Sequence, residues 1–216
     1  MERGLSLYQK YHIDREDDRL GLFELVAENF AVSSMMYPGC FVHLTPALVF
    51  PVSVFVDTDQ RADSFFKEKV VQKFIQDIRK YACVSEVRFL NSDNREKIPL
   101  EENSFDLLIS QYAGFISVYC SRYLKIGGLL LANNSHGDAS MDSIDPKYRC
   151  IGVIERYGSK YCLKSENLED FLSPKNGKPI IRERLLQVGR GMAFKKSASN
   201  FYFNAFHNSD NNRSYN

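Results

Sequence analysis

The chain lacks the features that would assign it to a membrane or secreted class. No stretch approaches the roughly 20 apolar residues that a membrane-spanning helix needs. The charged start, MERGLSLYQKYHIDREDD, has no apolar segment of the kind found in signal peptides. The sequence therefore predicts a cytoplasmic protein without membrane contact.

A strong net charge is also absent. The 28 Lys and Arg residues nearly balance the 27 Asp and Glu residues, which gives a formal net charge of +1. This balance does not indicate a strongly basic surface for nucleic acid, but it leaves a local basic patch open. The oligomeric state is left open as well.

Cysteine is sparse and shows no metal-binding or redox spacing. No CxxC pair occurs, and four of the cysteines lie in or beside apolar runs. Buried free thiols in a reducing compartment are the expected outcome. The five cysteines are Cys40, Cys83, Cys120, Cys150 and Cys162.

Apolar runs and amphipathic stretches alternate over the first two thirds of the chain. Such alternation favours an α/β fold whose mostly parallel sheet is covered by helices on both faces. The expected strands are 32–37, 52–57, 86–91, 105–110 and 128–134, and the expected helices are 17–30, 61–81 and 113–124.

After residue 137 the pattern changes to hairpin-like segments. The runs 148–156 and 160–165 flank a turn and predict an antiparallel hairpin, and 192–197 and 200–206 predict late strands.

With 216 residues, 44% of them hydrophobic, the chain suits one globular domain. We expect a single domain over 1–206, divided into a cofactor-binding core over 17–137 and a segment over 138–206. The second segment completes the sheet and is a candidate for substrate selection. The polar stretch 207–216 is predicted to be a disordered tail.

The ends of the strands carry the candidate functional residues. In an open parallel sheet, ligands bind beyond the carboxyl ends of the strands. Asp57 ends the second strand, twenty residues after Tyr37, which is the separation expected between a cofactor-binding turn and an acid that holds a ribose. The alternative is that Asp57 or Asp59 caps the helix that begins near residue 61.

Five short segments, in order, resemble the class I S-adenosylmethionine-dependent methyltransferases. They are Gly39 after the first strand, Asp57, Asp93 after the third strand, FDLL (105–108) and LKIGG (124–128). The resemblance covers roughly 17–137 and implies a Rossmann-like, mostly parallel, seven-stranded sheet with a C-terminal antiparallel hairpin.

The resemblance also implies S-adenosylmethionine as the cofactor. Asp57 would contact its ribose and Asp93 its adenine, while Asp93 has the alternative of capping its own loop. The residues assigned to the cofactor are Tyr37, Pro38, Gly39, Asp57, Thr58, Asp93, Asn94, Ser110 and Gln111.

The first turn departs from the family. It keeps one glycine, lacks the family's acid, and is followed by Pro46 and Pro51, which limit any helix from Thr45 to about one turn. The resemblance therefore supports binding of the adenosine more strongly than binding of the methionine moiety.

The loop NNSHGD (133–138) after the fifth strand is the most favourable position for catalytic residues. His136 can take a proton from an acceptor, and Asp138 can orient it. Tyr112 and Asn134 border the place of the acceptor. In the alternative interpretation, Asn134 and Asp138 only satisfy backbone groups of a turn. A metal is not expected, because HxD supplies too few ligands.

The sequence thus predicts a methyltransferase that acts on a small molecule. Adenine N6 and cytosine C5 methylation are disfavoured, because SQYAG after the fourth strand lacks their Asp/Asn-Pro-Pro-aromatic and Pro-Cys elements. The alternative is a non-catalytic module on the same scaffold that binds an adenosyl ligand or a partner, since one scaffold hosts many functions.

Overall fold

The computed structural model describes residues 3–111 and 113–206. Contacts divide the chain into two compact units, Met1–Pro99 and Leu100–Asn216. The predicted tail 207–216 lies outside the described residues. Within them, no helix combines the length and the apolar character needed to cross a membrane.

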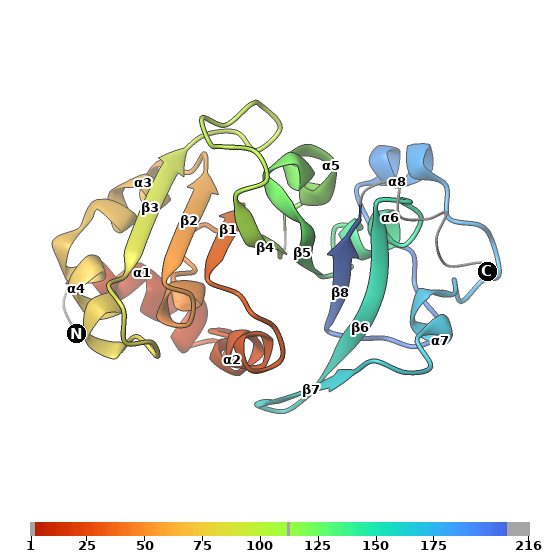
Figure 1. Ribbon diagram of the computed structural model, residues 1–216, viewed down its shortest axis with the longest axis horizontal. Coiled ribbons are helices and arrows are strands. Elements are labelled where there is room, and N and C mark those ends of the chain that lie inside the picture. Colours follow the sequence, from red (N-terminus) through yellow and green to blue (C-terminus); the bar gives the residue numbers. More distant parts are fainter. Residues whose placement is uncertain (1–2, 112, 207–216) are drawn as a thin grey trace. The chain divides into compact units, whose positions relative to one another are not determined.

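The first unit contains a three-stranded parallel sheet (Figure 1). Its strands are β1 (Ser34–Pro38), β2 (Val52–Asp57) and β3 (Glu86–Asn91), and β2 lies between the other two. Every residue of β1 is buried, as are the four central residues of β2. The continuous apolar runs in the sequence therefore correspond to strands that are buried on both faces.

Helical segments precede and follow these strands. Asp59 caps α3, since its carboxylate accepts a hydrogen bond from the Arg61 N–H at 2.8 Å. The helix predicted over 61–81 is two helices, because Glu68 adopts an extended backbone, with φ −70° and ψ 128°. The segments are η1 (Arg3–Leu5), α1 (Ser6–Tyr8), η2 (Gln9–Ile13), α2 (Leu20–Asn29), η3 (Thr45–Leu48), α3 (Gln60–Lys67) and α4 (Lys69–Ile78).

The second unit contains a five-stranded sheet. Its order is β4 (Phe105–Ser110), β5 (Leu124–Ala132), β8 (Asn200–Ala205), β6 (Tyr148–Tyr157) and β7 (Lys160–Lys164). The β4–β5 pair is parallel, and the remaining pairs are antiparallel.

These strands confirm the α/β fold class and the C-terminal hairpin, which β6 and β7 form. Five strands, β1 to β5, belong to parallel pairs. The predicted number of seven strands is exceeded by one among the described residues, which contain eight.

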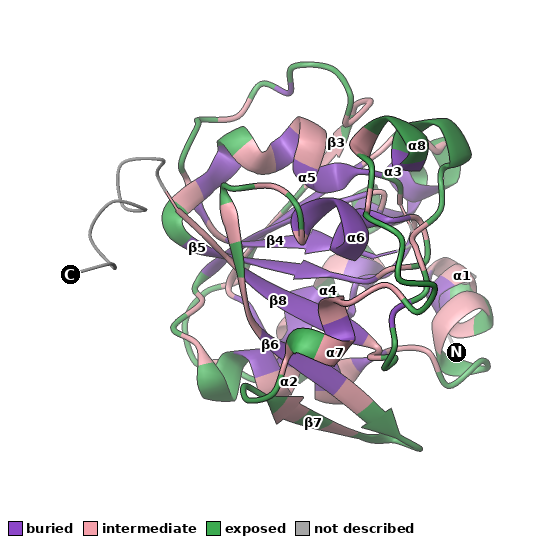
Figure 2. Cartoon of the chain, turned by 90° about the vertical axis from the view of Figure 1, so that its right-hand side faces the viewer, coloured by how far each residue is buried: buried purple, intermediate pink, exposed green. Residues whose placement is uncertain are grey.

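Short helices connect the strands of the second unit. Figure 2 shows α6 buried and α8 largely exposed. The strand predicted over 192–197 is wrong: this stretch makes only an isolated bridge between Pro174 and Phe194. The sequence analysis missed α8, which ends at Gly189 in the left-handed region, with φ 63°. The helices are α5 (Ile116–Cys120), η4 (Ser121–Tyr123), α6 (Asp138–Asp142), α7 (Glu169–Leu172) and α8 (Arg182–Val188).

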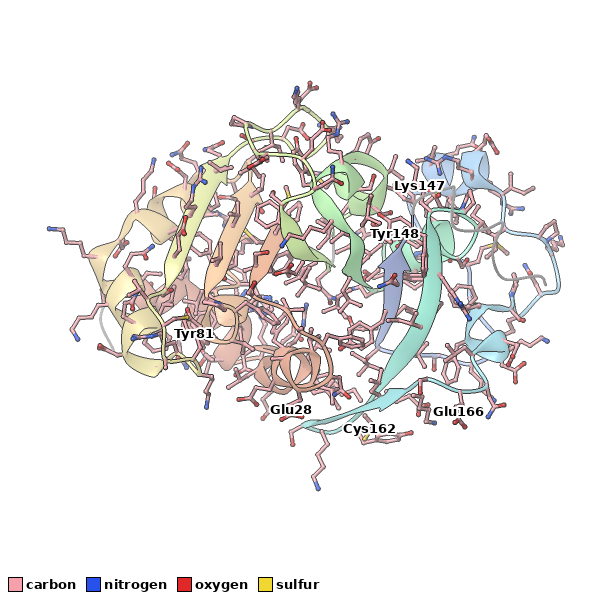
Figure 3. The ribbon with its side chains drawn as sticks, viewed as in Figure 1. Glu28, Tyr81, Lys147, Tyr148, Cys162 and Glu166 are labelled. Carbon is pink, nitrogen blue, oxygen red and sulfur yellow. The ribbon has the colours of Figure 1, made fainter. Side chains whose placement is uncertain are left out.

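The thiols follow the prediction only in part. Cys40 and Cys120 are buried and Cys150 is half-buried, but Cys83 and Cys162 are exposed. Cys162 lies on β7, whose residues alternate between exposed and half-buried positions (Figure 3). An apolar neighbourhood in sequence does not bury a residue on a strand with one solvated face.

The core of the first unit includes a stack of aromatic rings. The Phe66 ring on α3 stacks on Phe55 of β2 at 4.5 Å and on Phe89 of β3 at 5.2 Å between centroids. Phe66 is 3% exposed. This side chain therefore connects the helix to two neighbouring strands.

We expect Phe66→Ala to lower the free energy of unfolding by about 3–5 kcal/mol, because it leaves a cavity between α3 and the sheet. Urea-induced unfolding measures the change. Ile126→Ala is the control, since Ile126 is 60% exposed and its truncation should change the free energy by less than about 0.5 kcal/mol. Equal effects of the two substitutions would contradict the role of the stack.

Candidate functional site

Asp57 ties the end of β2 to the turn that follows β1. One carboxylate oxygen accepts a hydrogen bond from the Phe41 N–H at 2.7 Å, and the other accepts one from the Asp59 N–H at 2.9 Å. Asp57 is half-buried and Thr58 is exposed. Each carboxylate oxygen can accept further hydrogen bonds, so the acid has room for a ligand hydroxyl.

The turn after β1 uses its own N–H groups. The Gly39 N–H donates to Val56, the His43 N–H to Cys40, and the Leu44 N–H to Val42. Gly39 adopts φ 66°, so the single glycine of this turn serves a left-handed position. Three of the turn's donors are therefore engaged with protein carbonyl groups.

The residues around the turn are tightly packed. Tyr37 and Pro38 are buried, and the Tyr37 hydroxyl lies 3.2 Å from Nδ1 of His43. Residues 42–50 are all buried, including η3. The turn and η3 therefore form one tightly packed segment between β1 and β2.

The N-terminal segment packs against the same turn. The His12 ring stacks on His43 at 4.3 Å, and Nε2 of His43 lies 2.8 Å from the Asp18 carbonyl oxygen. The Tyr8 hydroxyl lies 2.8 Å from Oγ1 of Thr45. Burial, followed by the charges of His12 and Arg19, lowers the pKa of His43 well below its usual value. His43 is therefore a neutral, structural residue.

Asp93 forms its own loop at the end of β3. Its carboxylate pairs with the Arg95 side chain at 2.6 Å and accepts the Arg95 N–H at 2.9 Å. The Arg95 side chain lowers the pKa of Asp93 to about 2. Asn94 is half-buried beside it. Asp93 therefore caps its own loop, as the alternative interpretation predicted. Its contact with adenine stays a prediction.

Buried polar side chains join the ends of three strands in the second unit. Nε2 of Gln111, after β4, donates to Asn200 of β8 at 2.5 Å, and Nδ2 of Asn133, after β5, donates to Gln111 at 3.3 Å. Ser110 and Gln111 are 1% and 2% exposed. Gln111 thus belongs to a buried network, whereas the buried Ser110 hydroxyl makes no hydrogen bond of regular geometry within the described residues. Tyr112 lies outside the described residues.

Asn134 joins the loop after β5 to residues 190–193. Its Nδ2 donates to the Met192 carbonyl at 2.8 Å, and its Oδ1 accepts the Ser140 N–H at 3.0 Å. A Cβ added at Gly191 would overlap Asn134. A Cβ added at Gly137, where φ is 101°, would lie 3.2 Å from the backbone of Arg190 and Gly191. The two loops therefore approach at backbone distance, which only glycine permits here.

Asp138 does not orient His136 in the part of the chain that the structure describes, which corrects that prediction. Its carboxylate accepts the Phe115 N–H at 2.7 Å and the Ser117 N–H at 3.3 Å, and so holds the start of α5. His136 is half-buried, and its Nδ1 lies 3.1 Å from the Ser135 hydroxyl. Nearby backbone N–H groups attract the carboxylate because they are buried and need an acceptor. Asn134 and Asp138 both accept hydrogen bonds from backbone N–H groups, as the alternative interpretation predicted.

The sequence analysis missed a second buried carboxylate, Asp142, which is 1% exposed. It lies four residues after Asp138 on α6, so both carboxylates project from the same side of the helix. Neither Asp142 oxygen makes a hydrogen bond of regular geometry within the described residues. In the sequence, the spacing of four residues between the two acids of DASMD (138–142) could have indicated this pair.

Burial raises the pKa of both acids, and the charge of Asp138 raises that of Asp142 further. Burial raises the pKa of Asp138 to about 6. Burial, and then the charge of Asp138, raise the pKa of Asp142 well above its usual value. Tyr148 on β6 (Figure 3) has its hydroxyl buried without a partner among the described residues, and burial and the Asp142 charge raise its pKa. The two acids therefore titrate as a coupled pair, which holds a proton at higher pH than an isolated aspartate does.

Among the described residues, no group of three or more His, Cys, Asp and Glu side chains is arranged to hold a metal ion. The pair on α6 is a local polar cluster inside the second unit.

No family model matches the sequence. No curated protein matches it either.

Solved structures give weak similarities. A methyltransferase from Thermotoga maritima, described as a possible histamine N-methyltransferase, shares 10% identity over 94% of this chain and 96% of that chain, with a TM-score of 0.49. The YcgJ protein from Bacillus subtilis shares 18% identity over 88% and 98%, with a TM-score of 0.46.

A protein from Methanococcus maripaludis, provisionally described as an S-adenosyl-L-methionine-dependent methyltransferase, shares 14% identity with a TM-score of 0.42. The match covers 55% of this chain and 56% of that chain, about half the length of each. At these values the similarities carry no conclusion about activity.

We expect Asp142→Asn to stabilise the protein at neutral pH by on the order of 1–3 kcal/mol, because burying a carboxyl whose pKa is raised costs free energy above the unfolded-state pKa, and an amide does not titrate. The folded protein holds the Asp142 proton more tightly than the unfolded chain does. The gain should therefore be absent near pH 4, grow as the pH rises, and level off above the folded pKa. Denaturant unfolding at several pH values measures it.

Asp77→Asn is the control for this prediction. Its carboxylate is 56% exposed in a surface ion pair with Lys73, so its replacement should change the stability little at any pH. A loss of stability in Asp142→Asn that does not depend on pH would contradict the prediction.

Proposed function

We propose that the first unit binds S-adenosylmethionine and that the chain transfers its methyl group to a small-molecule acceptor. The observation that supports this most is the position of Asp57. Its carboxylate ends a buried central strand and is fixed by hydrogen bonds from the turn after β1 and from Asp59. A half-buried, oriented carboxylate with acceptor capacity to spare fits the two hydroxyls of a ribose.

The two ends of the ligand fit the turn unequally. The ribose end fits Asp57. The methionine carboxylate needs N–H donors, but those of Gly39, His43 and Leu44 donate to carbonyl groups of the protein. Residues other than these three donors would have to bind the methionine carboxylate.

When bound, S-adenosylmethionine supplies a methyl group whose bond to a positively charged sulfur breaks as the acceptor's oxygen or nitrogen bonds to the carbon. The acceptor must then lose a proton. We assign its removal to His136, whose Nδ1 lies beside the Ser135 hydroxyl and whose Nε2 makes no hydrogen bond within the described residues. A half-buried imidazole at the end of β5 has a free ring nitrogen that can act as a general base.

The second candidate function is a non-catalytic adenosyl-binding module. The closed hydrogen bonding of the turn after β1 favours it, because a ligand recognised only through its adenosine would not need the methionine site. The missing contact between Asp138 and His136 favours it as well.

Calorimetry tests the binding site. The wild-type chain should bind S-adenosylmethionine, and Asp57→Asn should weaken binding by about ten- to a hundredfold, since a charge-assisted hydrogen bond contributes about 1.5–3 kcal/mol. Asp59→Asn is the matched control: it changes a neighbouring acid that caps α3 and should leave the affinity unchanged. Equal affinity in wild type and Asp57→Asn would refute the ribose contact.

Adenosine separates the two functions in the same experiment. The methyltransferase requires S-adenosylmethionine and S-adenosylhomocysteine to bind more tightly than adenosine. Equal affinity for all three would support the non-catalytic module.

We expect His136→Ala to slow methyl transfer by about 10²–10⁴-fold, with the affinity for S-adenosylhomocysteine unchanged. Single-turnover transfer of labelled methyl from S-adenosylmethionine to hydroxyl and amine acceptors measures the rate. Ser135→Ala removes only the Nδ1 partner and should slow transfer less than His136→Ala does. A normal rate in His136→Ala would remove His136 from the reaction.

A further inference from the structure

A cavity of about 440 Å³ lies in the second unit, beside the loops that Asn134 joins. Its volume falls in the range of about 300–1,000 Å³ that is typical of small-molecule sites. Arg184, Leu185 and Val188 line it from one face of α8, since they follow helical spacing, and Ile181 lines it from the residue before the helix. The lining residues are Lys175, Asn176, Ile181, Arg184, Leu185, Val188, Arg190, Gly191, Met192 and Ala193.

The floor of the cavity is apolar. Leu185 packs with Phe115 and Met141 in one buried cluster, and Met192 packs against that cluster. Two further apolar lining residues are exposed, Ile181 to 47% and Val188 to 59%. Apolar side chains left open around a hollow are a surface that a ligand can cover.

The rim of the cavity is cationic. Lys175, Arg184 and Arg190 are exposed, none of the lining residues is acidic, and no ion pair joins these three cations to a described residue. The stretch 173–197 holds seven Lys and Arg residues against one Glu, in a chain of net charge +1. Three of these seven cations, Lys175, Arg184 and Arg190, line the cavity. They give its rim a positive charge.

We propose that this cavity binds a small organic anion with an apolar body, a carboxylate with a hydrocarbon or aromatic tail. The tail would cover Leu185, Val188 and Met192, and the carboxylate would pair with Arg184 and Arg190. Guanidinium groups suit this role because they bind carboxylates with two parallel hydrogen bonds.

One wall of the cavity is tied to the loop after β5. Gly191 and Met192 belong to this wall and contact Asn134 in that loop. The hydrogen bond from Asn134 to the Met192 carbonyl therefore holds the wall in place beneath a bound molecule.

Calorimetry with decanoate and no adenosyl ligand tests the cavity. Decanoate should bind the wild-type chain, and decanol, which has the same tail without the charge, should bind at least about tenfold more weakly. The Arg184→Gln/Arg190→Gln variant should lose at least about tenfold in decanoate affinity, because each lost charge-assisted pair weakens binding. Arg149→Gln, an exposed cation on β6 outside the cavity, is the matched control and should bind like wild type.

A second variant tests the apolar part. Val188→Asp adds a negative charge to the cavity at an exposed position and should abolish decanoate binding. Melting temperatures equal to that of the wild type show that each variant is folded.

Three results would overturn the proposal: no binding of decanoate to the wild type, equal binding of decanol, or an unchanged affinity in the double arginine variant. Binding of a short oligonucleotide at this site without binding of decanoate would overturn it too and would assign the cations to nucleic acid. Because no adenosyl ligand is present, failure of the methyltransferase proposal leaves these measurements unaffected.

Discussion

Buried backbone N–H groups at the ends of the strands need acceptors, and this requirement shapes both units. These groups are buried or part-buried, and an unpaired one would cost about as much as a lost hydrogen bond. Asp57 provides acceptors for the turn after β1, and Asp138 provides them for the start of α5. Asn134, in the loop before α6, does the same for the Ser140 N–H on α6. Side chains of the protein therefore satisfy these N–H groups without a ligand.

This requirement changes the meaning of the polar residues in the sequence. In the sequence, a carboxylate or amide at a strand end suggests a ligand contact. In this structure Asp57, Asp138 and Asn134 accept hydrogen bonds from backbone N–H groups of the protein. Asp57 keeps acceptor capacity and stays the best candidate for a ligand contact. Asp138 is buried to 1% exposure and is occupied by the start of α5. Neither Asp142 oxygen makes a hydrogen bond of regular geometry within the described residues. Burial and the charge of Asp138 raise the pKa of Asp142 well above its usual value.

The stretch between β7 and β8 provides the walls of the cavity in the second unit. The stretch between β7 and β8 has little regular structure except α7 and α8, and it reaches the loop after β5 through Asn134, Ser140 and Met192. Glycine at 137 and 191 allows that approach. The apolar face of α8 and the basic residues around it all come from this one stretch. Substitutions within it can therefore change the lining of the cavity without changing the strands of the sheet.

The sequence alone determined the fold class, because continuous apolar runs and helical periodicity depend on local neighbours. It also determined the cap at Asp59 and the hairpin after Tyr148, which are short-range features. The extended backbone at Glu68, the missed α8 and the partners of Asp138 depend on residues far along the chain or on how segments pack, and periodicity does not encode them. Tertiary structure alone decided that His136 lies beside Ser135 and not Asp138, because the buried N–H groups of α5, more than twenty residues away in sequence, take the carboxylate.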